Sequence, residues 1–146
     1  RSAEVCRTIG AELDDIGARL RGMGFRFHYH NHDHEIALQD GRPGIDWLLD
    51  HTATANVSFE ADVYWVQHGG QDPAQMIREY GRRIQLLHIK DEAEIGPGPV
   101  NFAPIFTAAE SIGAVEWYVI EVEKYNHDPI ESVRLSLEQM RNWGKA

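Results

Sequence analysis

The chain has 146 residues, of which 42% are hydrophobic and 25% charged, so we expect a single globular domain over residues 1–146 and not a disordered chain. Acidic residues outnumber basic residues by 23 to 14, and no run of Lys or Arg offers the basic face that a nucleic-acid-binding protein needs. No stretch approaches the ~20 apolar residues of a membrane-spanning helix, and the single cysteine, Cys6, cannot form an internal disulfide, so we expect a cytoplasmic protein without nucleic-acid or membrane partners.

Helices and strands are expected to alternate along the chain. Val5, Ile9, Leu13, Ile16 and Leu20 recur at helical spacing and predict one apolar helix face, with Cys6 in the core. The expected elements in chain order are a helix over 3–22, a strand over 25–30, a short helix over 45–49, a strand over 56–62, a helix from 72, a strand over 84–89, a helix over 104–112, a strand over 115–121 and a helix from 128.

Two Asp-Pro pairs mark helix starts in this pattern. Asp72-Pro73 and Asp128-Pro129 each offer an Asp at the N-cap and a Pro at the first helical position. Strands that alternate with helices predict right-handed crossovers and a parallel α/β sheet. No linker or composition shift marks an internal boundary, and neither a GxGxxG nor a GxxxxGK[ST] motif supports nucleotide binding.

Titratable residues stand where the four expected strands end, at His30, Asp62, His88 and Glu121. They are separated by 32, 26 and 33 residues, which is about one βα unit of roughly thirty residues each time. Because the carboxyl ends of parallel strands form the ligand-binding edge of such folds, we expect these side chains to converge. Imidazole and carboxylate together suit a divalent metal ion, with Mn or Zn expected first and Mg, Co and Fe as alternatives. A cation also removes the repulsion between neighbouring carboxylates.

Strand alternation predicts how the histidines of residues 28–34 are arranged. His28, His30 and His32 would share one face, and His34 is expected outside the strand and exposed. Among the tryptophans, Trp65 lies three residues after Asp62 and is a candidate pocket wall. The other three are expected in the core: Trp47, Trp117 and Trp143.

These residues resemble a known family. The matching motifs are Tyr29-His-Asn-His-Asp-His-Glu35, Glu60-Ala-Asp-Val-Tyr-Trp65, Gly69-Gly-Gln-Asp-Pro73, His88-Ile-Lys-Asp91, Gly96-Pro-Gly-Pro-Val-Asn-Phe102 and Val115-Glu-Trp-Tyr-Val-Ile-Glu121. They are similar to the sugar phosphate isomerase/epimerase family of xylose-isomerase-like TIM barrels. That family also includes inosose dehydratases, ketose 3-epimerases and endonuclease IV-type enzymes. The resemblance covers essentially the whole chain.

The resemblance implies a metal ligand at the end of each of barrel strands five to eight. Asp62, His88 and Glu121 match the last three ligands. In the ketose epimerases the first ligand is a Glu, whereas the matching position here is His30, as in the subgroup with the Tyr-His-Asn-His motif. The first and last Glu of the epimerases form a proton-transfer pair. The replacement by His30 therefore makes lyases and dehydratases acting on inososes or 3-keto sugars as plausible as epimerases.

Length implies that half of such a barrel is absent. A full (β/α)8 barrel takes about 250 residues, so we expect a fragment with the parallel half-barrel of strands 5–8. Its two open strand edges would need cover. We expect a homodimer or higher oligomer, or association with the missing amino-terminal half.

The preferred interpretation is a metal-dependent isomerase or epimerase that removes a proton next to the carbonyl of a sugar, sugar phosphate or keto-polyol. Glu121 or His32 is the expected base, and Trp65 and His28 are expected to bind the carbohydrate. Lys90 would stabilise developing negative charge, bind a phosphate or form a salt bridge with a neighbouring acid.

Three alternatives stay open at this point. A metal-dependent lyase or dehydratase shares the first chemical step. A non-catalytic half-barrel could keep the metal but lack a substrate pocket. An abasic-site endonuclease is disfavoured by the net charge of −9.

Overall fold

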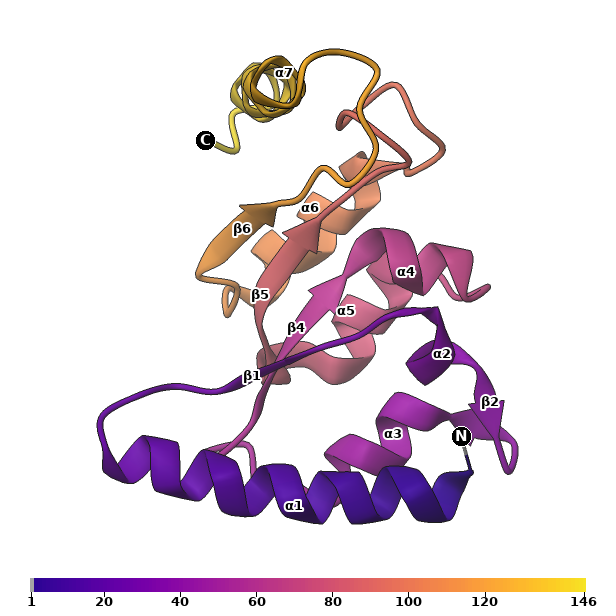
Figure 1. The fold of residues 1–146 in the computed structure, drawn as a ribbon, viewed down its shortest axis with the longest axis vertical. Helices are drawn as coiled ribbons and strands as arrows, with labels where there is room; N and C mark the ends of the chain where they lie inside the picture. The colour runs from indigo at the N-terminus through magenta and orange to yellow at the C-terminus, as the bar shows by residue number, and fades with distance from the viewer. Residues whose placement is uncertain (1) are drawn as a thin grey trace.

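The structure is a computed structural model and describes residues 2–146. A four-stranded parallel sheet forms its centre, in the order β1-β4-β5-β6 (Figure 1). The strands are β1 (His28–His30), β4 (Ser58–Asp62), β5 (Ile84–Ile89) and β6 (Trp117–Ile120). Because each new strand pairs with the preceding one in the sheet, the spatial order follows the chain order, as expected for one arc of a (β/α) barrel.

Seven α-helices, a small hairpin and a short 3-10 helix complete the described chain. The helices are α1 (Ala3–Gly22), α2 (Asp33–Ile36), α3 (Gly44–Leu49), α4 (Val63–His68), α5 (Pro73–Tyr80), α6 (Phe102–Ile112) and α7 (Pro129–Asn142). The hairpin pairs β2 (Leu38–Gln39) with β3 (Arg42–Pro43), and the 3-10 helix is η1 (Gly81–Arg83). Helices α1 and α7 lie at opposite ends of the molecule (Figure 1). Among residues 2–146, no helix is both long and apolar enough to span a membrane.

The two Asp-Pro helix starts are confirmed. The Asp72 carboxylate accepts the backbone N–H groups of Ala74 and Gln75 at the start of α5. The Asp128 carboxylate accepts the N–H of Ile130 at the start of α7. In each case the side chain satisfies N–H groups that have no partner within the helix.

The elements that sequence analysis missed lie between the expected strands. Helices α2 and α4 and the β2–β3 hairpin are only two to six residues long, too short to show a periodic apolar pattern. Helix α4 begins directly after Asp62 with Val63, Tyr64 and Trp65, residue types that favour strands. Asp62 overrides that preference because its side chain caps the helix by accepting the N–H of Trp65.

The predicted apolar face of α1 is only partly buried. Ile9 and Leu13 pack against the core, whereas Val5 and Ile16 are exposed. The fully buried positions of the helix are small residues, including Cys6, Gly10 and Gly17. Glycine is required at this contact with α3: a Cβ at Gly10 would lie 2.3 Å from a backbone oxygen of Leu48. Close approach of the two helices therefore decides which side faces inward. The core position expected for Cys6 is confirmed.

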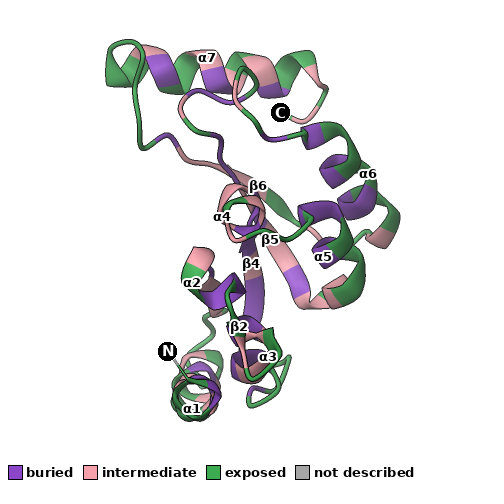
Figure 2. Cartoon of the chain, turned by 90° about the vertical axis from the view of Figure 1, so that its right-hand side faces the viewer, coloured by how far each residue is buried: buried purple, intermediate pink, exposed green. Residues whose placement is uncertain are grey.

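The core lies between the central strands and the helices α5 and α6. Phe59 of β4 and Leu87 and Ile89 of β5 are buried against Ile77 of α5 and Ile105 of α6. Figure 2 shows the buried segments on β4, α5 and α6 as purple ribbon. The sheet and the helices both contribute apolar side chains to this contact. Burial of this cluster is therefore the main source of folding free energy.

The outer strands are shorter and less buried than predicted. The expected strand over 25–30 is only His28–His30, and Phe25 is exposed. Trp117, expected in the core, is 66% exposed at the start of β6. Within the described part of the chain, the outer edges of β1 and β6 have no strand partner. Self-association through these edges stays a prediction.

Candidate metal centre

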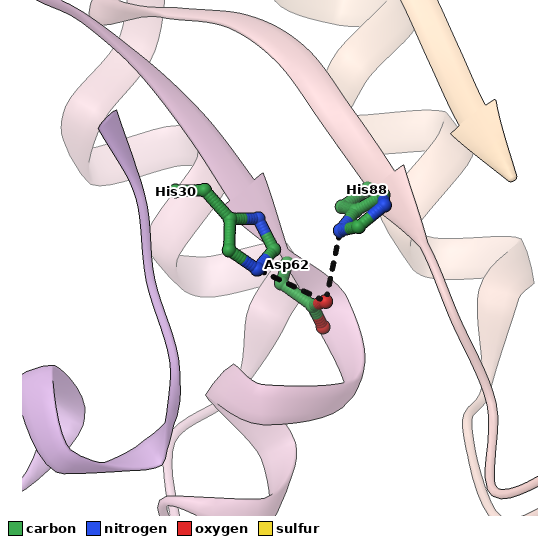
Figure 3. A group of neighbouring side chains, drawn as sticks. All are labelled: His30, Asp62 and His88. Atoms are coloured by element: carbon green, nitrogen blue, oxygen red, sulfur yellow. Dashed lines mark ion pairs between the residues drawn. The ribbon is translucent and has the colours of Figure 1, made fainter. Parts of the chain in front are cut away.

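Three predicted ligands meet at the carboxyl-terminal edge of the sheet. His30 is the last residue of β1, Asp62 is the last residue of β4, and His88 is paired with Asp62 in the register of β4 and β5. Each offers one ligand atom, and these atoms all lie within 4.8 Å of one another. In Figure 3 the Asp62 carboxylate lies between the two imidazole rings, one on each neighbouring strand. We call these three residues the ligand triad.

Asp62 is the fixed centre of the ligand triad. Its side chain is completely buried, and its backbone N–H donates to the side-chain oxygen of Asn31 at 2.9 Å. One carboxylate oxygen, Oδ1, caps α4 by accepting the N–H of Trp65 at 2.9 Å. The other, Oδ2, lies 3.8 Å from Nε2 of His30 and 3.2 Å from Nδ1 of His88. The cap thus orients the carboxylate so that one oxygen faces the histidines.

Glu121, the fourth predicted ligand, lies at the side of the triad. It is the first residue after β6, and its backbone N–H donates to the carbonyl of Ile89 at 3.1 Å. Its Oε2 lies 3.2 Å from Nδ1 of His88 and 3.4 Å from Nζ of Lys90. The structure therefore brings Glu121 next to one triad histidine and to a lysine at the same time.

The electrostatics of the two histidines differ. Burial, together with the charges of His88 and other cations, lowers the pKa of His30 to about 4, against the opposing effect of Asp62. Burial also disfavours the charged form of His88, but the adjacent carboxylates of Asp62, Glu121 and Glu60 outweigh it and raise its pKa. At neutral pH His30 is thus a neutral imidazole with a free lone pair, and His88 lies where positive charge is stabilised.

These residues fit a divalent cation. Asp62 Oδ2 and His88 Nδ1 are buried and lie 3.2 Å apart as an ion pair, but neither makes a hydrogen bond. Buried polar atoms that lack a hydrogen bond cost free energy, and a cation bound by both atoms would compensate that loss. Two imidazoles with one or two carboxylates are the donor set that suits Mn, Fe, Co or Zn. The ligand triad could therefore hold a divalent metal ion.

Lys90 is buried and paired with acids. Its Nζ lies 3.4 Å from Glu121 and 2.5 Å from Glu123, and 5.5 Å from the centre of the Trp65 ring. The hydrogen bond from Lys90 lowers the pKa of Glu123. Of the alternatives open for Lys90, the salt bridge with neighbouring acids is present. Its neighbour Asp91 is not one of them, because its carboxylate accepts backbone N–H groups.

His32 and Trp65 form the rim beside the ligand triad. The His32 ring centre lies 4.9 Å from that of His30 and 5.6 Å from that of Trp65. His32 is exposed and is the N-cap of α2, where its backbone N–H donates to the buried carboxylate of Glu35 at 2.8 Å. His34 is exposed, as predicted.

His28 does not join this group. The charged residues that act on it are Arg26 and Glu116, and its pKa is lowered chiefly by burial. Those two residues form a two-fold hydrogen-bonded ion pair, with distances of 2.5 and 2.8 Å, next to the amino-terminal ends of β1 and β6. His28 therefore lies toward the opposite end of the sheet from the ligand triad.

Three residues of the site were not expected from the sequence. Asn31 holds the backbone of Asp62, and Glu35 holds the backbone of His32. Strand alternation would place Asn31 on the face opposite His30, but β1 ends at His30. The capping motif that contains Glu35 has a histidine, His32, where Ser or Thr is usual. Glu60 points to the same face as Asp62 two residues later, and burial raises its pKa. Strand alternation could have found it.

Comparison with known proteins decides the family. A family model described as a xylose isomerase-like TIM barrel matches residues 1–143. The chain belongs to this family. Four parallel strands in chain order confirm the predicted half-barrel of the xylose isomerase-like fold. That it is the carboxyl-terminal half stays a prediction.

Two solved structures are similar to this chain in fold. A sugar phosphate isomerase/epimerase from Parabacteroides distasonis has a TM-score of 0.90 and 29% identity, covering 97% of this chain and 53% of that one. A 3-keto-D-glucoside 4-epimerase from E. coli has a TM-score of 0.73 over 97% of this chain and 56% of that one, and its 22% identity shows the fold alone.

One curated relative is an inosose dehydratase from Geobacillus thermodenitrificans. It is 25% identical over 55% of this chain and 35% of its own length. The chain thus spans about half the length of the solved structures and about a third of this relative.

Proposed function

We propose that this chain carries the metal-binding part of an isomerase or epimerase that acts on a sugar, sugar phosphate or keto-polyol. The observation that supports it is the convergence of His30, Asp62 and His88, with two buried ligand atoms left without a hydrogen bond. The family and the similarity to the 29% identical sugar phosphate isomerase/epimerase from P. distasonis support this substrate class. The reaction begins with removal of a proton next to a carbonyl.

The metal ion would be Mn or Zn, with Mg, Co and Fe as alternatives. When bound, such an ion polarises the carbonyl and hydroxyl oxygens of a substrate and so acidifies the neighbouring C–H group. His30, Asp62 and His88 would hold it, and Glu121 is close enough to His88 to complete the set.

Two residues are candidates for the base that takes the proton. Glu121 is partly exposed and lies beside Lys90, whose positive charge faces the same region. His32 is exposed at the rim, within ring contact of His30. Lys90 can stabilise negative charge that develops on a substrate oxygen. Trp65, next to His32, offers a flat apolar surface against which the C–H face of a sugar ring can pack.

A dehydratase acting on inososes or 3-keto sugars is the second candidate. It is favoured by the presence of His30 where the ketose epimerases have a glutamate, which leaves Glu121 as the carboxylate at the partly exposed side of the triad. The 25% identical relative is an inosose dehydratase. Both reactions begin with the same proton removal and differ in whether a hydroxyl group then leaves.

Solvent deuterium exchange tests the proposal. The purified protein, loaded with Mn²⁺, is incubated in D2O with a panel of ketoses, inososes and 3-keto glycosides, and the products are analysed by NMR. We expect deuterium at the carbon next to the carbonyl, lost on treatment with EDTA and in Glu121→Gln or His32→Gln. An epimeric product supports the isomerase/epimerase, and an unsaturated product supports the dehydratase. Metal binding without any exchange would favour a non-catalytic metal-binding protein.

A further inference from the structure

The loop after β5 is folded around one buried carboxylate. Asp91 accepts four backbone N–H groups, from Glu92 at 2.9 Å, Gly96 at 3.2 Å, Gly98 at 3.1 Å and Val100 at 3.4 Å. A Cβ at Gly98 would lie 1.9 Å from this carboxylate, so only glycine allows the loop to close so tightly. The loop over residues 91–100 is therefore a fixed structure that starts directly after Lys90.

This fixed loop carries a second buried carboxylate, Glu94, which binds the following loop. Glu94 Oε1 accepts the backbone N–H of Asn126 at 2.9 Å and the hydroxyl of Ser132 at 2.5 Å. Its Oε2 accepts the side-chain amide of Asn126 at 2.6 Å. A buried carboxylate is costly unless several donors satisfy it, and here three donors from another part of the chain do so.

Asn126 belongs to the segment 121–128, which begins with Glu121 and connects β6 to α7. At its start the segment is held by Lys90, which pairs with Glu121 and Glu123. Near its end it is held by Glu94. Lys90 directly follows β5 and Glu94 lies in the loop 91–100, so two buried side chains fix the segment that presents Glu121 to the strand that presents His88.

We propose that Glu94 is a positioning residue: it fixes the segment 121–128 and so places the Glu121 carboxylate beside the ligand triad. Glu121 needs such support because it follows an edge strand that has a neighbour on one side only in the described chain. Glu94 acts through Glu121 and does not touch the triad. This inference rests on the proposed function only in the role that it gives to Glu121. The hydrogen bonds between Glu94 and Asn126 are a property of the fold and do not depend on that role.

Amide hydrogen exchange tests the attachment without any metal. Glu94→Gln keeps the size of the side chain but removes its charge, and we expect exchange of the amides in 121–128 to become about tenfold faster. Exchange of β4 should not change, because a local attachment is lost and not the whole fold. Glu92→Gln is the matched control in the same loop. Glu92 also reaches the segment, through an ion pair with Lys124 at 3.6 Å, but both side chains are exposed. An exposed ion pair contributes little, so we expect exchange of 121–128 to change far less than in Glu94→Gln. Unchanged exchange of 121–128 in Glu94→Gln would overturn the proposal.

Mn²⁺ titration in two backgrounds tests whether Glu94 acts through Glu121. In the wild-type background we expect Glu94→Gln to weaken Mn²⁺ binding about tenfold. In the Glu121→Gln background the same change should have almost no further effect. An equal loss in both backgrounds would mean a general structural role and would contradict the proposal. If the wild-type protein binds no Mn²⁺, the proposed function fails, and the exchange experiment still decides the role of Glu94.

Discussion

The central strands and the edge strands of this sheet differ in how firmly they hold their side chains. On β4 and β5, Phe59 and Leu87 are completely buried between the sheet and its helices. On β6, Trp117 is largely exposed, and all three residues of β1 are only partly buried. The exposed fractions of the four predicted ligands show the same difference. Asp62 is fully buried and His88 is 16% exposed, whereas His30 is 25% and Glu121 28% exposed.

This difference indicates how the site is built. The central strands supply ligands that packing has already placed, and the edge strands supply ligands that need extra support. His30 is an example. Its neighbour Asn31 lies beyond the end of β1, but the side-chain oxygen of Asn31 accepts the backbone N–H of Asp62 and so ties this edge strand to the central one. Glu121 follows it through Lys90. In such a site the ligands on the central strands are held in fixed positions, whereas the ligands on the edge strands can adjust.

Truncation of one central and one edge aromatic residue gives the largest contrast. Phe59→Ala removes a fully buried ring from the core, and we expect it to lower the free energy of unfolding by about 3–5 kcal/mol. Trp117→Ala should change it by less than about 0.5 kcal/mol, because the ring is already in water. Urea unfolding measures both. A large loss at Trp117 would show that this edge is covered in solution, as self-association predicts.

The edge ligands should contribute less to metal affinity than the central ones. We expect His30→Ala and Glu121→Gln each to weaken Mn²⁺ binding about tenfold, because water can replace a partly exposed ligand. Isothermal titration measures the affinity, and His51→Ala, an exposed histidine that follows α3 and is not part of the site, is the control. If either edge variant abolishes binding altogether, the distinction between central and edge ligands is wrong.

A smaller effect is expected from pH at the loop attachment. Hydrogen bonds from Ser132 and Asn126 lower the pKa of Glu94 from 4.5 to about 2. The ionised carboxylate thus stabilises the fold above about pH 4.5, and this contribution is lost as the pH falls toward 2. The difference in unfolding free energy between wild type and Glu94→Gln should therefore shrink between about pH 6 and about pH 3. A difference that stays constant over this range would contradict the assignment.

The sequence predicted the parts of the molecule that depend on repeated local signals. The spacing of His30, Asp62, His88 and Glu121 follows one βα unit, and it placed three of them in one cluster. The Asp-Pro pairs located two helix starts. These features need only a few neighbouring residues to be recognised.

The features that sequence analysis missed depend on contacts between distant residues. Glu94 accepts hydrogen bonds from Asn126 and Ser132, which lie more than thirty residues later in the chain. No local sequence pattern indicates that contact. The buried side of α1 is set by close packing of Gly10 and Gly17 on other segments, so only part of the apolar stripe, Ile9 and Leu13, packs against the core. Trp117 is apolar but lies on an edge strand, where burial depends on what covers the edge.

Metal binding by Asp62 is the most direct test of the account. Protein stripped with EDTA is titrated with Mn²⁺ and Zn²⁺, as wild type and as Asp62→Asn, which keeps an oxygen to cap α4. Asp72→Asn, the same change at the N-cap of α5 and outside the ligand triad, is the control. We predict one bound ion per wild-type and Asp72→Asn chain and an affinity lower by more than about 100-fold in Asp62→Asn. Wild-type protein that binds neither ion, or Asp62→Asn that binds as tightly as wild type, would contradict the metal site.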